Sequence, residues 1–265
     1  MLGKRIISSL LLILMIIGVM SIDWLCGLAV ILFIAAGLYE FFHMLENKQV
    51  VNYKYFGIGM GIIIPLSIMF RFELTKGWEF LFIILAFLSL ILMQFKRRQN
   101  SGAIIGISTT IFGIIYISWF FSFLIKIRYL EGGLGLLASL LLITKSCDIG
   151  AYLIGSRFGK NPLIPRISPH KTVEGAIGGV CFSILSALAC KPLLNFGYLH
   201  LVVIGAGISI LAQLGDLSES LIKRDCQVKD SGSIFPGMGG VLDQIDSLLF
   251  TAPVFYFYIS VTLLK

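Results

Sequence analysis

The chain has 265 residues, of which 57% are hydrophobic and 13% are charged, and its mean hydropathy is +0.95. This composition excludes a soluble globular protein, because water would not tolerate so much uncovered apolar surface. The net charge of +7 needs no nucleic-acid partner, since a basic membrane-protein surface attracts anionic lipid headgroups, and we find no RNA- or DNA-binding motif. We therefore predict an all-α, polytopic membrane protein.

Apolar runs close to the ~20 residues that a spanning helix needs recur along the chain. They predict about nine transmembrane helices, at residues 6–22, 24–42, 55–70, 80–95, 103–125, 134–153, 174–190, 199–220 and 246–263. The first run follows Lys4 and Arg5, as in a signal peptide. No A-x-A-like cleavage site follows and a second apolar run begins at once, so we interpret it as a retained span.

The basic residues predict an orientation for these spans. With the N-terminus in the cytoplasm, the cytoplasmic side carries 14 of the 21 lysines and arginines, the opposite side carries six, and Lys145 lies inside a span. This asymmetry obeys the positive-inside rule. It places every unusual polar segment, and therefore any active site, on the cytoplasmic face.

Ionisable residues divide the chain into two parts. Up to about Leu130 the predicted spans are almost free of them and the loops are short, whereas polar residues enter the spans beyond about Leu134. We expect residues 1–130 to form a transmembrane scaffold and residues 131–265 to carry the functional site.

The first polar segment of the second part is TKSCDIGAYLIGSRFGK, from Thr144 to Lys160. Lys145 and Asp148 are three residues apart and share one face of a helix inside an apolar run. A charge there is costly unless it is paired or faces a cavity. Two interpretations stay open, a structural ion pair and a functional site, and we favour the site.

The second polar segment, NPLIPRISPHKTVEGAIGG, has prolines at 162, 165 and 169 that break any helix. His170 and Lys171 then precede a small-residue helix, for which Thr172 is a candidate cap and Glu174 lies in the first turn. Basic side chains ahead of a helix N-terminus suit a phosphate. A solvated loop with a capped helix is an equally good interpretation.

The third segment gathers acids around a glycine-rich loop between Gly215 and Phe250. Asp216, Glu219 and Lys223 share one face if the helix from about residue 199 continues past Asp216, and Asp243 and Asp246 share one face at the start of the last span. Such carboxylates repel one another unless a cation lies between them, and oxygen ligands without His or Cys favour Mg²⁺.

The loop between the acids, DSGSIFPGMGG, lets the backbone approach a ligand closely and offers N–H groups to phosphate oxygens. Acids for a metal, a glycine loop and nearby basic residues together describe a nucleotide or pyrophosphate site. The alternative is a polar loop whose charges are solvated, but such a loop has no reason to place acids in spaced pairs at the membrane boundary.

The stretch SLIKRDCQVKDSGSIFPGMGGVLDQID resembles the C-terminal signature of the phosphatidate cytidylyltransferase (CDP-diacylglycerol synthase) family. CDIGAYLIGSRFGK and SPHKTVEGAIGG resemble its two upstream motifs, so the likeness covers roughly the second half of the chain in the right order. Three positions depart from the pattern. Met238 and Gln244 stand where the family has His and Arg, and His170 stands where it has Lys.

The resemblance implies that CTP and phosphatidic acid are converted to CDP-diacylglycerol and pyrophosphate in phospholipid biosynthesis, at the cytoplasmic face of a bacterial inner membrane. A phosphate monoester is already an anionic nucleophile near neutral pH, so the protein must chiefly bring two anions together. Mg²⁺ is the implied cofactor. Asp148 would either orient Lys145 or hold a second cation. The sequence leaves the oligomeric state open, a homodimer included.

The predicted catalytic residues are Asp216, Asp243, Asp246 and Lys223, and the predicted metal ligands are Asp216, Asp243 and Asp246. The predicted substrate-binding residues are Lys171, Arg224, Lys229, Asp230, Gly237, Gly239, Gly240, Asp148, Ser168 and Thr172. Three alternatives remain: a CDP-alcohol phosphotransferase, whose D-G-x-x-A-R motif is absent; a transporter, for which we find no internal repeat; and a diverged, non-catalytic lipid- or nucleotide-binding protein.

Overall fold

The structure is a computed structural model of the chain and describes residues 18–71, 78–96, 101–235, 237 and 239–263. Most of the predicted span 6–22 and the departure at Met238 therefore lie outside the described residues. Within the described part the fold is almost entirely helical, and its strands form one short hairpin.

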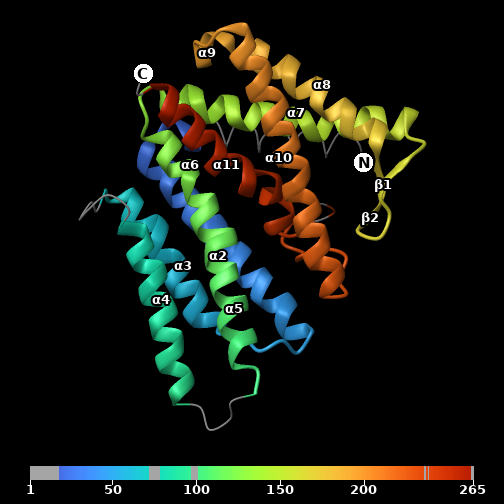
Figure 1. Cartoon of the computed structure of the whole chain (residues 1–265). Helices are drawn as coiled ribbons and strands as arrows, with labels where there is room; N and C mark the ends of the chain where they lie inside the picture. The colour runs from blue at the N-terminus through green and yellow to red at the C-terminus, as the bar shows by residue number, and fades with distance from the viewer. Residues whose placement is uncertain (1–17, 72–77, 97–100, 236, 238, 264–265) are drawn as a thin grey trace.

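The helices follow one another closely along the chain (Figure 1). The first half contains α2 (Asp23–Asn47), α3 (Lys54–Met69), α4 (Trp78–Phe95), α5 (Ala103–Gly113), the π-helical segment η1 (Ile114–Trp119) and α6 (Phe120–Arg128). The second half contains α7 (Gly133–Phe158), β1 (Pro162–Ile164), β2 (Ser168–Thr172), α8 (Val173–Ala189), α9 (Lys191–Leu194), α10 (Tyr198–Asp225) and α11 (Leu242–Leu263).

An all-α membrane protein is confirmed, whereas the number of nine spans is not. Among the described residues, six stretches are long and apolar enough to cross a membrane: α2, α4, the continuous rod from α5 to α6, α7, α10 and α11. Two shorter apolar helices, α3 and α8, fall on two further predicted spans. Helices suit this setting because they satisfy their backbone hydrogen bonds internally in lipid.

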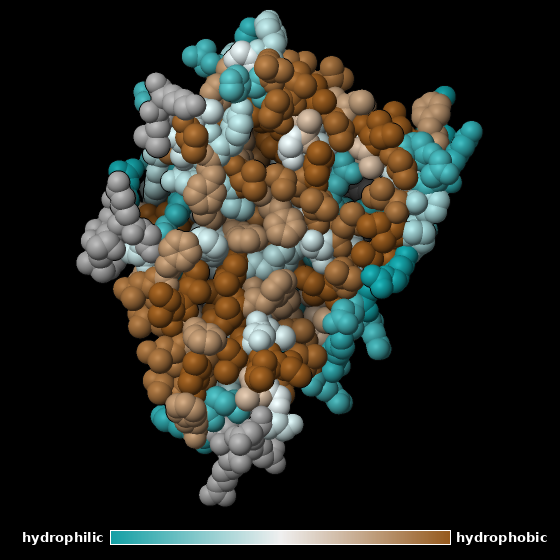
Figure 2. Space-filling model, viewed as in Figure 1, coloured by the Kyte–Doolittle hydropathy of each residue, from teal (hydrophilic) through white to brown (hydrophobic). Residues whose placement is uncertain are grey.

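The surface is divided into an apolar region and polar regions. Figure 2 shows hydrophobic residues over most of the visible face, with hydrophilic residues gathered at the helix ends and along the edge where Figure 1 places the hairpin. The arrangement therefore has an apolar body for lipid and a polar edge near the hairpin.

Helices α10 and α11 join the two halves of the chain. Helix α10 packs on α7, α8 and α11, and α11 packs in turn on α6. At this junction Gly37 of α2 lies against the side chains of Ile117, Leu242 and Ile245, which are buried. Residues far apart in sequence thus meet where the predicted acidic residues lie.

Helices α7 and α8 run side by side in close contact (Figure 1). A Cβ atom on Gly150 would lie 2.6 Å from Cβ of Phe182 and 2.8 Å from the carbonyl oxygen of Gly178. A Cβ atom on Gly178 would lie 2.6 Å from Cβ of Ile154. Small residues let the two backbones approach, as is common between membrane helices.

The proline-rich segment breaks the helix as predicted, but it also folds into an antiparallel hairpin that the sequence did not indicate. Pro162 pairs with Thr172 and Ile164 pairs with Ser168. The predicted cap is confirmed, because the backbone amide of Gly175 donates to Oγ1 of Thr172 at 3.1 Å.

Glu174 fastens this hairpin to the start of α8, outside the six candidate spans. Its carboxylate accepts hydrogen bonds from the backbone amides of Lys160 and Asn161 and from the side chain of Asn161. The Lys160 amide, with the amides of Glu174 itself and of Asn161, lowers the pKa of this carboxyl to about 2. Glu174 therefore stays ionised at neutral pH.

Candidate active site

Three carboxylates meet between α10 and α11. Asp216 and Glu219 are one turn apart on α10, and Asp246 lies in the first turns of α11. One carboxylate oxygen from each lies within 4.8 Å of the others. Helical continuation past Asp216, as predicted, is what brings Glu219 into this group, which we call the carboxylate cluster.

The carboxylate cluster fits a hard cation. Asp246 is buried, its oxygen accepts a hydrogen bond from the amide of Ser247, and the described residues place no lysine or arginine within ion-pair distance of it. Glu219 is fully buried, and it shares the ammonium group of Lys223, 2.5 Å from its Oε2, with Asp243. Buried carboxylates without adequate donors are costly, and an oxygen-coordinated Mg²⁺ would satisfy them.

Asp243 lies outside the carboxylate cluster and fastens the glycine-rich loop. Its Oδ2 accepts hydrogen bonds from the amide and hydroxyl of Ser231, at 2.9 and 2.8 Å, and from the amide of Gly240 at 2.7 Å. Its Oδ1 contacts Nζ of Lys223. Gly239 has a φ of +89°, and a Cβ atom there would collide with Asp243. The loop is therefore folded around this carboxylate.

A second carboxylate at the loop comes from the first half of the chain. Glu40 of α2 is 4% exposed, and it accepts hydrogen bonds from the amides of Val241 and Leu242, each at 2.9 Å, and from the hydroxyl of Ser231 at 3.0 Å. It thereby satisfies amides at the start of α11, which a helix N-terminus leaves without internal partners. Glu40 is not among the site residues predicted from the sequence.

A polar cavity of about 580 Å³ opens beside the carboxylate cluster, between α7, the hairpin, α8 and α10. Its lining includes residues from all three polar segments, among them Asp148, Ser168, His170, Lys171, Thr172 and Asp216. Nζ of Lys171 lies 2.5 Å from Oδ2 of Asp216. The structure thus brings all three polar segments to one cavity.

Lys145 and Asp148 form an ion pair at 3.1 Å, so the pairing considered from their spacing is present. Lys145 also lies 3.4 Å from the carbonyl oxygen of Gln244 and from the hydroxyl of Ser247. Because Asp148 also lines the polar cavity, the pair belongs to the wall of the candidate site as well.

Several predicted phosphate contacts lie elsewhere. Arg224 donates from Nε to the carbonyl oxygen of Ile167 at 3.2 Å, which ties the hairpin to the end of α10. Lys229, Asp230 and Gly237 are exposed and are not among the residues that line the polar cavity. Gly240 is buried against Glu40. The roles predicted for these residues stay predictions.

The sequence matches the cytidylyltransferase family over residues 3–262. A phosphatidate cytidylyltransferase of Synechocystis sp. (strain PCC 6803) is 30% identical over 290 aligned residues, covering 98% of this chain and 97% of the relative. The chain belongs to the cytidylyltransferase family. The resemblance seen in the sequence is thereby confirmed, and it extends over both halves.

Two other relatives match the present chain over a shorter range. A phosphatidate cytidylyltransferase of Bacillus subtilis (strain 168) is 43% identical over 149 residues, or 55% of each chain. The uncharacterized protein YnbB of Escherichia coli (strain K12) is 42% identical over 151 residues, which cover 57% of this chain and 50% of the relative. The matched part of the chain thus spans about half the length of these two relatives.

Proposed function

We propose that this cytidylyltransferase-family member is a phosphatidate cytidylyltransferase that converts CTP and phosphatidic acid to CDP-diacylglycerol and pyrophosphate. The observation that carries the proposal is that the two upstream family motifs line one polar cavity together with Asp216, which joins Asp246 of the C-terminal signature in the carboxylate cluster. The relatives named as phosphatidate cytidylyltransferases support the same substrates.

In the proposed reaction a phosphate oxygen of phosphatidic acid attacks the α-phosphorus of CTP. The new bond joins this oxygen to the α-phosphorus, and the bond to the β-phosphate bridging oxygen breaks, so that pyrophosphate leaves with the electron pair. The lipid phosphate is already anionic near neutral pH and needs no strong general base. Catalysis then depends on positioning two anions and compensating their charge.

Asp216, Glu219 and Asp246 are the proposed metal ligands, a set that has Glu219 where the sequence-based prediction has Asp243. Mg²⁺ held there would neutralise the phosphates of CTP and the departing pyrophosphate. We assign Asp243 instead to positioning, because its oxygens are occupied by Lys223, Ser231 and Gly240. A second cation at Asp148 is not needed in this proposal, since Lys145 compensates that charge.

Lys171 is the proposed contact to the triphosphate. Lys171 lines the polar cavity, and its ammonium group forms an ion pair with Asp216. The carboxylate of Asp216 would also contact the metal ion. Ser168 and Thr172 offer neighbouring hydroxyls on the same wall, although the hydroxyl of Thr172 already caps α8. The hairpin therefore presents the nucleotide-binding side of the site.

We place the site at the cytoplasmic side of a bacterial inner membrane, in agreement with the positive-inside asymmetry. CTP would enter the polar cavity from water, and phosphatidic acid would enter laterally from the leaflet. A homodimer is one predicted assembly, which crosslinking in native membranes would test.

The test is conversion of CTP labelled on its α-phosphate to a CDP-lipid by purified protein with phosphatidic acid and Mg²⁺ in detergent. We expect a labelled lipid and one pyrophosphate per turnover, both lost in Asp216→Asn. The control Asp225→Asn removes an exposed acid that pairs with Lys48 and should keep the activity. Folded protein that forms neither product would contradict the proposal.

A further inference from the structure

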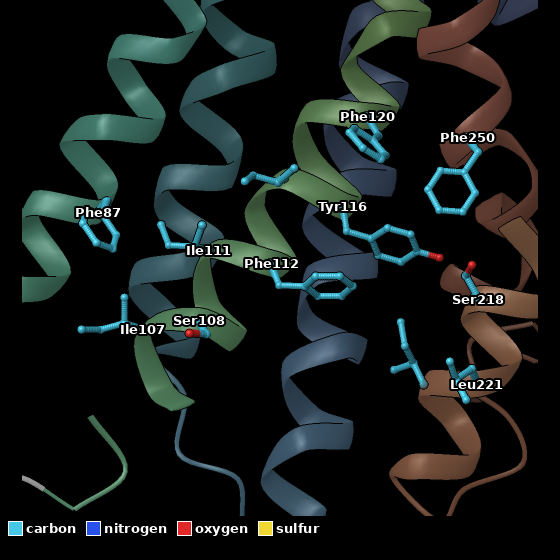
Figure 3. A pocket seen from close by; sticks show the side chains of 12 residues that line it. Phe87, Ile107, Ser108, Ile111, Phe112, Tyr116, Phe120, Ser218, Leu221 and Phe250 are labelled. Carbon is cyan, nitrogen blue, oxygen red and sulfur yellow. The ribbon is translucent and has the colours of Figure 1, made fainter. Parts of the chain in front are cut away.

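A second hollow, the apolar groove, shares no lining residue with the polar cavity. It has a volume of about 690 Å³ and is bounded by α4, α5, η1, α6, α10 and α11. Figure 3 shows side chains from both halves of the chain facing this space, among them Phe87, Ile111, Tyr116 and Leu221. Nine of its 12 lining residues are Phe, Ile or Leu, so it suits an apolar occupant.

The inner end of the groove holds a polar atom without a partner. The Tyr116 side chain is 3% exposed, and its hydroxyl has no hydrogen-bond partner among the residues that the structure describes. Its ring stacks on Phe112 and meets Phe250 edge-on, with centroids 5.1 and 5.8 Å apart. In Figure 3 the hydroxyl points across the groove toward α10. Buried hydroxyls are normally satisfied, so this one lacks an acceptor.

The groove is adjacent to the carboxylate cluster. The hydroxyl of Tyr116 is close enough to Asp246, Glu219 and Asp216 to interact with them electrostatically. Ser218 next to Glu219 and Phe250 one turn after Asp246 both line the groove. Tyr116 also lies in the π-helical segment, and such segments often occur at functional sites.

The outer end of the groove is open at the level of the apolar surface. Phe87 and Phe112 border it and are 48% and 46% exposed. Exposed Ile84 and Leu88 lie on the same helix as Phe87, so this side is suited to contact lipid tails. A molecule that enters here passes from an apolar opening to the Tyr116 hydroxyl and the carboxylate cluster.

We propose that the apolar groove binds an acyl chain of phosphatidic acid and that the Tyr116 hydroxyl donates a hydrogen bond to the phosphate of the same lipid. The occupant must be apolar along most of its length and polar at one end, which describes a lipid with a small anionic headgroup. The inference rests on the proposed function for the identity of the lipid, and it adds where that lipid lies.

Photolabelling tests the location without requiring turnover. The probes are phosphatidic acid and phosphatidylcholine that carry a diazirine on otherwise identical acyl chains, added to the purified chain in detergent. We expect phosphatidic acid to label residues 107–120 and 218–222 several-fold more than phosphatidylcholine does. Equal labelling by both probes would show nonselective lipid contact and overturn the proposal, as would labelling confined to other helices.

Tyrosine variants test the hydroxyl. Tyr116→Phe should raise the KM for phosphatidic acid about tenfold, the size expected for losing one hydrogen bond to a charged group, and leave the KM for CTP unchanged. Tyr55→Phe makes the same change at an 86% exposed tyrosine outside the groove and should change neither KM. Equal KM values for phosphatidic acid in Tyr116→Phe and Tyr55→Phe would overturn the role of the hydroxyl.

A matched pair of leucine variants tests whether the apolar groove binds the acyl chain. Leu221→Trp fills the groove from α10, whereas Leu185→Trp makes the same change at an exposed leucine of α8 outside it. Only Leu221→Trp should raise the KM for dioleoyl phosphatidic acid. The KM for dihexanoyl phosphatidic acid, whose chains are short, should change less in either variant. If both variants have the same KM for dioleoyl phosphatidic acid, the groove does not bind the acyl chain.

The outcomes separate this inference from the proposed function. Selective labelling of the groove without CDP-lipid formation would support lipid binding and contradict the enzyme activity. CDP-lipid formation without selective labelling would support the activity and overturn the inference about the groove.

Discussion

At the scale of single residues, the acidic side chains of the site divide by what their oxygens contact. Asp243 and Glu40 accept hydrogen bonds from backbone amides and from Ser231, so they hold the glycine-rich loop and the start of α11. Glu219 and Asp246 are buried with few donors, which leaves them available to a cation. Residue type alone cannot make this distinction, because it depends on which donors the fold brings near.

The sequence allowed the acids of α10 and α11 to be predicted as site residues, because their spacing places them on shared helix faces. It placed Asp243 among the ligands, since nothing in the spacing shows that Ser231 and Gly240 donate to it. Glu40 left one signal, a lone ionisable residue in an apolar run. Its partners are about 200 positions away, and only the packing of α2 against α11 reveals them.

We predict that Glu40→Gln destabilises the protein by about 1 to 3 kcal/mol, because an amide cannot replace both acceptor oxygens facing Val241 and Leu242. The matched control is Glu46→Gln, which changes a partly exposed glutamate of the same helix. Thermal unfolding in detergent would measure the difference. Equal melting temperatures for the two variants would show that Glu40 does not hold the loop.

At the scale of elements, most helices could be predicted and the hairpin could not. Long apolar runs specify helices in lipid whatever their neighbours are, so eight of the predicted spans fall on described helices. The prolines at 162, 165 and 169 exclude a helix without specifying an alternative. The pairing of Pro162 with Thr172 and the contacts of Glu174 supply that alternative through the fold.

The π-helical segment is likewise not visible in the sequence. Ile114–Trp119 has the apolar composition of its neighbours, and the predicted span 103–125 passes through it without interruption. The wider turn nevertheless occurs where Tyr116 reaches toward the site.

We predict that Gly178→Ala destabilises the protein by about 1 to 3 kcal/mol and lowers activity, because the new methyl group would overlap Ile154 and separate α7 from α8. Gly207→Ala is the control, since a Cβ atom at Gly207 of α10 meets no atom within 4 Å. Thermal unfolding and the CDP-lipid assay would be run on both. If Gly178→Ala changed neither the melting temperature nor the activity, the close contact of α7 and α8 would not be required for stability or activity.

At the scale of the whole molecule, the site belongs to both halves of the chain. The sequence predicts a division into a scaffold of residues 1–130 and a functional part of residues 131–265. Within the described structure, Glu40 and Tyr116 from the first half nevertheless reach the glycine-rich loop and the surroundings of the carboxylate cluster. The proposed lipid substrate would explain this arrangement, because its acyl chain needs an apolar wall and its phosphate needs a place beside the carboxylate cluster.

Asp216, Glu219 and Asp246 are proposed to bind the metal ion for cytidylyl transfer. The most direct measurement is the Mg²⁺ concentration for half-maximal CDP-lipid formation in wild type, Glu219→Gln, Asp243→Asn and the exposed control Asp225→Asn. We predict that Glu219→Gln raises this concentration at least about tenfold, as loss of one ligand should, while Asp243→Asn lowers the maximal rate and leaves the Mg²⁺ requirement near that of wild type. An unchanged requirement in Glu219→Gln with a raised one in Asp243→Asn would contradict it.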